Sequence, residues 1–371
     1  MNNIKFTNLF KLVPQKKKIF SKIFKLVKES KFVGGEEVEK FEKNFSKYIR
    51  SKYCISVGNG TDALEIAINS LNLKKGSETI VPNNTWISTA EAVVTCGHKV
   101  VFCDVNLDDY SICLNDLKKK INKKTKAIIA VHLYGNPAEM SKIKKITSGK
   151  NIKIIEDCAQ AHGTRINNKH VGIFGDVGTF SFFPGKNLGA FGDAGAIVTN
   201  SKKIFDFCLR SRNHGALKKY DHKFSGRNSR LDTINAAVLN IKLKNINKQI
   251  KKRKNLANIY FKNFKNNKYV ETYKLDKKNI STFHQFVIRL KSRNELKKYL
   301  SKFKIDTMIH YPYMLNELTF FKNKKILKNS YNLGRKILSL PISEEHTKKE
   351  IYFVCKTINS FFKNKKYKTN L

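Results

Sequence analysis

Acidic residues and arginine are scarce in this sequence of 371 residues, which carries 29 Asp and Glu against 73 Lys and Arg and a net charge of +44. Only 10 of the basic residues are arginine, the residue best suited to binding phosphate groups with two hydrogen bonds. The basic runs, such as 16–18 and 118–120, are short and scattered. We therefore interpret the charge as a solvated lysine-rich surface and expect no nucleic-acid partner, although a basic nucleic-acid-binding regulatory protein is the alternative that the charge supports.

The seven cysteines include no C-x-x-C pair and no zinc-ligand spacing, so we expect reduced thiols, no metal site and a cytoplasmic protein. No apolar run approaches the roughly 20 residues that cross a bilayer, so no membrane partner is expected. Near the N-terminus, lysines separate Phe20, Ile23, Phe24 and Val27. This spacing indicates a helix that docks on the rest of the protein, with a membrane-surface helix as the alternative.

Short strand-like runs alternate with helical patterns in the first 245 residues. The alternation predicts an α/β fold with a mixed, mostly parallel sheet between helices, and the runs at 179–183 and 194–199 indicate a closing hairpin. The pattern then changes to a lysine-rich helix over 241–260 and to shorter elements typical of a smaller α+β domain. We expect a large domain over residues 1–245, with an N-terminal arm, and a small C-terminal domain over 246–371.

Two segments at predicted strand ends carry groups suited to binding a ligand, since ligands of open α/β sheets bind beyond the carboxyl ends of the strands. Gly58–Leu64 places glycines and Thr61 at a helix start, which suits a single phosphate or forms a capped turn. Ile154–Gly163 ends a strand with Glu156 and Asp157, which face opposite ways. A buried aspartate needs a partner such as a protonated ring nitrogen, although helix capping is an alternative role.

Two further segments supply a nucleophile and an aromatic ring. Phe180–Gly189 holds Lys186 among apolar residues and glycines, where desolvation lowers a lysine pKa and makes the amine reactive toward carbonyls; a solvent-facing loop lysine is the alternative. Pro82–Thr89 holds the only tryptophan, Trp86, which could stack on a flat cofactor or belong to the core. Together, a phosphate cradle, an acid, a lysine and an aromatic ring match the requirements of pyridoxal 5′-phosphate.

These motifs resemble those of the DegT/DnrJ/EryC1/StrS family of pyridoxal-phosphate sugar aminotransferases. The resemblance extends from about Phe32 to about Leu340 and implies a large domain of fold type I, similar to aspartate aminotransferase. It rests on the following segments: Gly60–Leu64, Val131–Gly135, Glu156–Gly163, Ser181–Gly189, Asn213–Gly215 and Gly226–Asp232.

The resemblance also implies roles for individual residues. Lys186 looks like the catalytic lysine that bonds the cofactor and carries the proton, and Asp157 looks like the acidic partner of the ring nitrogen. The other residues that match cofactor contacts are Gly60, Thr61, Trp86, Gln160, Ser181 and Asn228. Because the family's counterpart of Asn228 reaches the phosphate of the neighbouring subunit, the resemblance implies a homodimer with shared active sites. The residues implied near the substrate are His162, Arg230, His310 and Tyr311.

The reaction that the resemblance implies moves the amino group of L-glutamate onto a keto nucleotide sugar in amino-sugar biosynthesis. The residues around Lys186 and after Asn228 are similar to those of the branch that acts on 3-keto sugars. We therefore predict a nucleotide-linked 3-keto-6-deoxyhexose as acceptor, with a 4-keto sugar as the alternative. Related sugar dehydratases carry histidine in place of the lysine, so Lys186 argues against dehydration.

Overall fold

The computed structural model describes residues 3–276, 278–321 and 325–363. The helices are α1 (Lys16–Lys28), α2 (Glu36–Ile49), α3 (Gly60–Ser70), α4 (Ser88–Thr95), α5 (Leu114–Lys120), α6 (Met140–Thr147), α7 (Lys202–Ser211), α8 (Thr233–Leu243), α9 (Ile246–Phe264), α10 (Arg293–Lys302), α11 (Lys328–Lys336) and α12 (Lys348–Lys363). The strands are β1 (Tyr53–Val57), β2 (Glu78–Pro82), β3 (Lys99–Cys103), β4 (Thr125–Val131), β5 (Lys153–Asp157), β6 (Arg165–Ile166), β7 (Lys169–His170), β8 (Val177–Ser181), β9 (Gly195–Thr199), β10 (Glu271–Thr272), β11 (Asn279–Ile280), β12 (Phe286–Arg289) and β13 (Ile337–Leu340).

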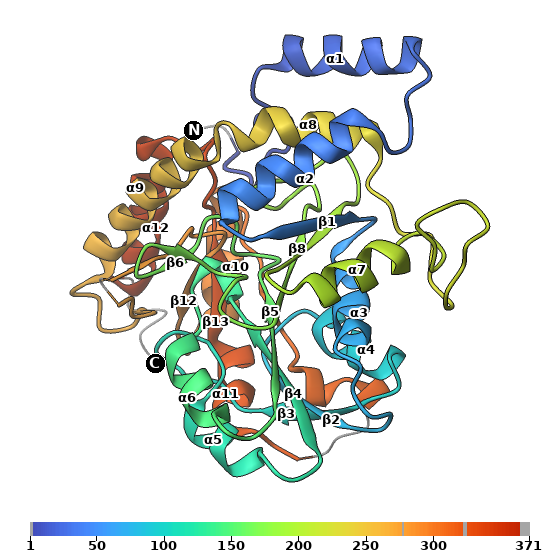
Figure 1. Ribbon diagram of the computed structural model, residues 1–371. Helices are drawn as coiled ribbons and strands as arrows, with labels where there is room; N and C mark the ends of the chain where they lie inside the picture. The colour runs from blue at the N-terminus through green and yellow to red at the C-terminus, as the bar shows by residue number, and fades with distance from the viewer. Residues whose placement is uncertain (1–2, 277, 322–324, 364–371) are drawn as a thin grey trace.

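The central sheet has seven strands in the order β1-β9-β8-β5-β4-β2-β3, and helices cover it on both sides (Figure 1). All strands except β9 run in the same direction, because β9 is antiparallel to both β1 and β8. The mixed, mostly parallel sheet and its closing β8–β9 hairpin are therefore confirmed. The carboxyl ends of β2, β4, β5 and β8 meet at one edge of the sheet, where parallel sheets place their ligands.

Alternate residues of the strands enter two separate apolar clusters, so both faces of the sheet are buried. On β5, Ile155 packs with residues of α3, α4 and α7, whereas Ile154 packs with residues of α2, α5, α6 and α8. The ring of Phe45 on α2 meets the ring of Phe180 edge-on, with centroids 5.0 Å apart. This contact holds the end of β8, from which the chain continues to Lys186.

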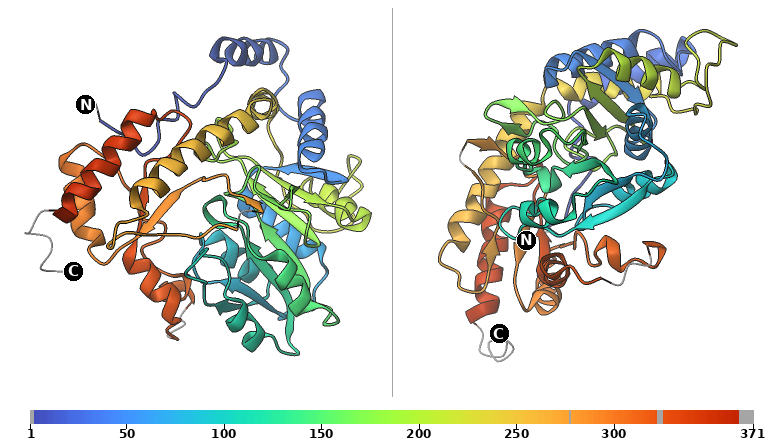
Figure 2. Two further views of the ribbon diagram at one scale, coloured as in Figure 1. Left: turned by 90° about the vertical axis from the view of Figure 1, so that its left-hand side faces the viewer. Right: turned by 60° about the horizontal axis from the view of Figure 1, so that its bottom comes forward.

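The C-terminal part forms an antiparallel sheet, β10-β12-β13, against which α9, α10 and α12 pack. It lies beside the large sheet (Figure 2), as expected for an α+β unit, and the boundary at 245/246 stays a prediction. Several contacts cross that boundary, two of them β-pairings. Ile4, which we expected in the large domain, forms a parallel bridge with Ile305, and β11 pairs with β6 of the first part.

The helical stretch expected over 241–260 is present but divided between two helices, because α8 ends at Leu243 and α9 begins at Ile246. Neither proline nor glycine marks this break, and the run of lysines continues through it. The chain turns here, so that α8 packs beside α2 on one face of the large sheet while α9 packs against α12.

The N-terminal helix α1 docks on α8, as predicted, and stands at the top of Figure 1. The side chains that make the contact are Ile19 and Ile23, which pack with α8, whereas Phe20 and Phe24 are 52% and 72% exposed. Over the described residues, every helix is either too short or too polar to cross a bilayer.

Candidate active site

The start of α4 joins two of the predicted segments at the carboxyl edge of the sheet. Thr61, in the first turn of α3, donates a hydrogen bond from Oγ1 to Oγ of Ser88 over 2.8 Å. The next residue, Thr89, donates from its own Oγ1 to Oδ2 of Asp157, also over 2.8 Å. The helix start therefore fixes the distance between the predicted phosphate cradle and the predicted acidic group.

The first turn of α3 is shaped to receive an anion. A Cβ placed on Gly60 would lie 2.7 Å from Cβ of Ser181, so only glycine lets the end of β8 approach this turn so closely. The N–H groups of Gly60 and Thr61 have no acceptor within the helix, because they are its first two residues. With the positive end of the helix dipole and the hydroxyls of Thr61 and Ser181, this turn fits a phosphate group.

Asp157 and Glu156 face opposite sides of the sheet and do different work, as the strand periodicity predicted. Asp157 is buried at the end of β5 and accepts hydrogen bonds from Thr89 and from the backbone N–H of Ala159. Glu156 is fully buried and accepts the N–H groups of the 172–175 loop over 2.6 to 2.8 Å. Asp157 thus faces the ligand edge, and Glu156 holds a loop together.

Glu156 also lies beside His132 and Cys158, three buried groups close enough to surround a metal ion. Nδ1 of His132 accepts the N–H of Ala138 over 3.0 Å, so Nε2 carries the proton and donates it to Glu156 over 3.0 Å. Both ring nitrogens and both carboxylate oxygens are therefore engaged in hydrogen bonds within the fold. These hydrogen bonds account for the buried histidine and glutamate without a metal ion.

Lys186 is partly buried in the loop that follows β8. Burial lowers the pKa of its ammonium group to about 8, and the carboxylate of Asp157 opposes this shift. A lysine with this pKa exposes a useful fraction of neutral amine near pH 7, which is the form that attacks a carbonyl. The structure thus brings Lys186 and Asp157 close enough to interact, as the sequence analysis expected.

Gln160 and two tyrosines connect this edge to the C-terminal part. The Oε1 atom of Gln160 accepts the backbone N–H of Tyr134 over 2.7 Å, and its Nε2 donates to the hydroxyl of Tyr311 over 3.2 Å. The ring of Tyr311 lies 5.7 Å from that of Trp86. Trp86 is 58% exposed, so it keeps a face free for a flat ligand and is not a core residue.

Two predicted substrate residues, His162 and His310, occupy different environments. His162 is fully buried between the rings of Phe180 and Phe182, and burial lowers its pKa to about 3. This leaves no surface of His162 open, so its burial does not support a substrate contact. His310 is partly exposed and bonds to Oγ of Ser339 over 2.9 Å through Nδ1; burial and the nearby Lys186 lower its pKa to about 4.

Asn228 is exposed on the loop between α7 and α8. Both of its neighbours are anchored to Asp62 in the first turn of α3. Nη1 of Arg227 donates to Oδ1 of Asp62, and Oγ of Ser229 donates to Oδ2, each over 2.6 Å. Asn228 is thus presented outward on a fixed loop, a geometry suited to reaching another subunit.

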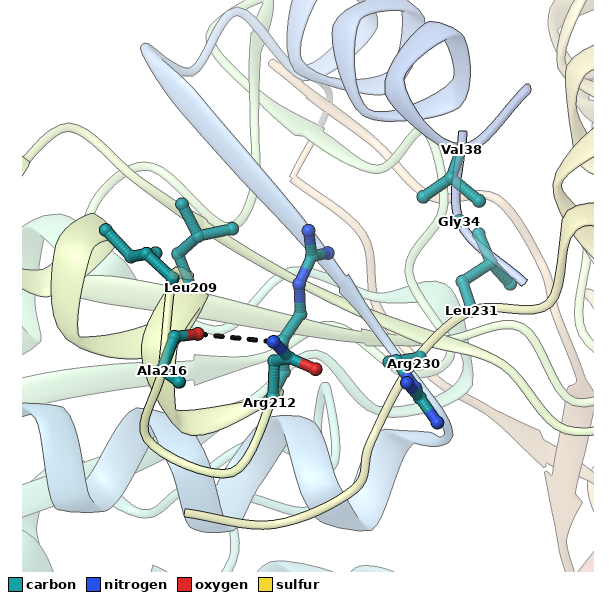
Figure 3. Close-up of a pocket in the computed structure, with 9 residues that line it drawn as sticks. Gly34, Val38, Leu209, Arg212, Ala216, Arg230 and Leu231 are labelled. Atoms are coloured by element: carbon teal, nitrogen blue, oxygen red, sulfur yellow. Dashed lines mark hydrogen bonds between the residues drawn. The ribbon is translucent and has the colours of Figure 1, made fainter. Parts of the chain in front are cut away.

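Arg230 is exposed and lines a cavity of about 250 Å³ between the start of α2, the end of α7 and the same loop (Figure 3). Val38, Leu209 and Leu231 supply apolar walls. Arg212 also lines it, but its Nη1 is bonded to the backbone oxygen of Ser56 over 2.8 Å. The backbone of Arg230 lies close to the start of the predicted cradle segment, since a Cβ on Gly58 would be 3.8 Å from its carbonyl oxygen.

Sequence reasoning missed several residues that organise the site, including Ser88, Thr89 and Tyr134. Ser88 and Thr89 open a helix directly after a predicted strand end, which was the available signal. Tyr134 sits in a family motif, but its bonds to Gln160 and to the backbone oxygen of His310 join segments that are distant in the chain.

Comparison with known proteins gives matches over nearly the whole chain. A family model described as the DegT/DnrJ/EryC1/StrS aminotransferase family matches residues 14–359. The dTDP-3-amino-3,6-dideoxy-alpha-D-galactopyranose transaminase of Aneurinibacillus thermoaerophilus is 38% identical over 333 residues, covering 89% of this chain and 91% of that protein.

Solved structures also match the fold of this chain over nearly its whole length. Streptomyces venezuelae DesV, crystallised in complex with a ketimine intermediate, has a TM-score of 0.95 at 30% identity, covering 98% of this chain and 100% of that one. NtdA of Bacillus subtilis, with bound cofactor PMP, has a TM-score of 0.91 at 27% identity, covering 98% and 86%. The predicted fold class and the resemblance are therefore confirmed.

Proposed function

We propose that this chain, which belongs to the DegT/DnrJ/EryC1/StrS aminotransferase family, moves the amino group of L-glutamate onto a nucleotide-linked 3-keto-6-deoxyhexose. The chain is a pyridoxal-phosphate-dependent nucleotide-sugar transaminase. The proposal adds two points, that L-glutamate is the amino donor and that the keto group of the acceptor is at carbon 3. The observation that carries the reaction is Lys186, with its pKa lowered to about 8, beside the buried Asp157 and the cradle at Gly60.

The choice of a 3-keto sugar has two supports. The relative from Aneurinibacillus is named for a 3-amino-3,6-dideoxy sugar linked to dTDP. The segments Pro184–Gly189 and Ser229–Asp232 also resemble the branch that acts on 3-keto sugars. A 4-keto acceptor is the alternative that the experiment must separate.

Pyridoxal phosphate, when bound, supplies the aldehyde that takes up the amino group and the ring that stabilises negative charge at the substrate carbon. Gly60, Thr61 and Ser181 would bind the phosphate through N–H and hydroxyl groups. Asp157, oriented by Thr89, would hold a proton at the ring nitrogen, and its burial makes that charge pair strong.

Lys186 would carry a proton between the substrate carbon and the cofactor, first for glutamate and then for the sugar. Trp86 would cover one face of the cofactor ring, and Gln160 would orient its phenolic oxygen. Tyr311 contacts both side chains and so joins the C-terminal part to this side of the site. His310 and Tyr311 are the residues of the C-terminal part best placed to meet a sugar.

We also infer a homodimer in which Asn228 of each subunit reaches the phosphate of the other. The anchoring of Arg227 and Ser229 to Asp62 supports this arrangement, because it holds the exposed Asn228 on a fixed loop. Arg230, two residues further on, would then also face the other subunit.

The test is the visible spectrum of the purified protein before and after the addition of L-glutamate. We expect a yellow protein whose band fades while 2-oxoglutarate appears in equal amount, and no such change in Lys186→Ala. The amine form is then offered 3-keto and 4-keto nucleotide sugars, and NMR of the product locates the new amino group. A protein that stays colourless with pyridoxal phosphate would contradict the reaction, and amination at carbon 4 would correct the acceptor.

A further inference from the structure

Lys242 is a buried lysine that the proposed reaction does not use. It lies in the last turn of α8, it is 5% exposed, and its Nζ donates a hydrogen bond to the backbone oxygen of Gly189. Burial lowers the pKa of this group to about 8, and Glu344 is the charge near enough to oppose the shift. Burying an ammonium group is costly unless it has partners, and the partner here is the loop that carries Lys186.

Gly189 closes this loop on itself. A Cβ on Gly189 would lie 2.3 Å from the backbone oxygen of Pro184, so the two ends of the loop are in direct contact. The next residue, Ala190, donates its N–H to the oxygen of Phe182 over 2.7 Å, and Lys186 donates its own N–H to Phe183 over 2.8 Å. A displacement of the Gly189 carbonyl is therefore transmitted to the backbone of Lys186.

A second side chain of α8 holds the same loop. Asn235 precedes Lys242 by seven residues, which places both on one face of the helix. Its Oδ1 accepts the N–H of Phe191 over 3.0 Å. The helix thus binds a carbonyl and an N–H group on the C-terminal side of Lys186.

We propose that Lys242, together with Asn235, is a positioning residue for Lys186. The bond to Gly189 fixes the loop so that the amine of Lys186 stays within reach of both atoms between which it carries the proton. The inference rests on the proposed function, because it assumes that role of Lys186. Lys242 acts through the backbone and does not need to contact the reacting atoms.

The test compares Lys242→Met, Lys242→Arg and the matched control Lys244→Met as holoenzymes, since Lys244 is exposed at the end of the same helix. In Lys242→Met we expect kcat with glutamate to fall about 10- to 100-fold, as a small misplacement of a catalytic group does, while KM changes by about twofold or less. The pH midpoint of the visible band, which reports the surroundings of Lys186, should move by about half a unit or more. Lys242→Arg, which keeps a donor, should recover most of kcat, and Lys244→Met should match the wild type.

A folded Lys242→Met enzyme with the kcat and the pH midpoint of the wild type would overturn the inference. If that variant does not fold, Asn235→Ala decides: unchanged kcat and midpoint overturn the inference, and a decrease of about 3- to 10-fold with a shifted midpoint supports it. A wild-type protein that binds no pyridoxal phosphate would instead defeat the proposed function, so the two failures are distinguishable.

Discussion

Replacing Gly60 with alanine tests the phosphate cradle with a single added atom. The new Cβ would lie 2.7 Å from Cβ, 3.2 Å from Oγ and 3.3 Å from Cα of Ser181. Because carbon atoms in contact prefer about 3.5–4.0 Å, the helix turn and the strand end must separate by about 1 Å. The N–H groups of the turn would then lose contact with the phosphate, and a hydrogen bond to a charged group is worth about 1.5–3 kcal/mol. At 1.4 kcal/mol for each tenfold change, pyridoxal phosphate should bind about 10- to 150-fold more weakly.

The chain provides its own probe for this measurement. Trp86 is the only tryptophan, it is 58% exposed, and it lies beside Tyr311 at the site. Titrating the apoenzyme with pyridoxal phosphate should therefore quench nearly all tryptophan emission, and the curve yields Kd for each variant directly.

The matched control is Gly192→Ala, because the nearest atom to its new Cβ is Nδ2 of Asn235 at 3.7 Å, an ordinary contact. Its Kd should equal that of the wild type. If Gly60→Ala also binds pyridoxal phosphate as tightly as the wild type, the phosphate does not lie at the first turn of α3 and the proposed cradle is refuted.

Three further outcomes follow from the geometry. The rate at which the visible band forms when pyridoxal phosphate is added to the apoenzyme should rise about tenfold per pH unit up to pH 8 and then level off, because the pKa of Lys186 is lowered to about 8 and the neutral amine is the reactive form. A rate that is flat from pH 6 to 8 would contradict this. Thr89→Val removes the hydroxyl that bonds Asp157 and should lower kcat about tenfold, since such a bond is worth about 1.5–3 kcal/mol, with recovery in Thr89→Ser as the check. Glu156→Gln should lower the free energy of unfolding, measured in urea, by about 1.5–3 kcal/mol and leave kcat/KM of the folded enzyme unchanged, because the carboxylate oxygens bond the loop at Gly172 and not the ligand edge. A loss of activity at unchanged stability would show that the role of Glu156 is not structural.

The position of the site was predictable because it depends on local pattern. A parallel sheet gathers the carboxyl ends of its strands at one edge, so the residues after 57, 82, 157 and 181 had to meet there. The opposite orientations of Glu156 and Asp157 followed from the two-residue period of a strand, and the structure confirms them.

The finer connections were not predictable, because they depend on how distant elements approach one another. The bond between Thr89 and Asp157 joins residues 68 positions apart, and nothing in either segment specifies the distance between α4 and β5. The same holds for the bridge of Ile4 to Ile305, which attaches the N-terminal arm to the C-terminal part. His162 was misleading for a related reason. A polar residue in a motif indicates a ligand, but Phe180 on β8 and Phe182 just after it pack against the ring of His162.

Burial lowers the pKa values of three histidines near Lys186. It lowers the pKa of His162 to about 3 and of His310 to about 4, and it places the pKa of His284 well below its usual value. The charge of Lys186 acts on all three in the same direction, so each histidine is neutral when that lysine is protonated. The neutral rings do not compete with Lys186 for the proton, and His310, which is partly exposed, can orient a ligand through a hydrogen bond. In the proposed reaction, Lys186 is therefore the group that takes up and releases the proton in both halves, which is why its position matters more than the number of polar groups around it.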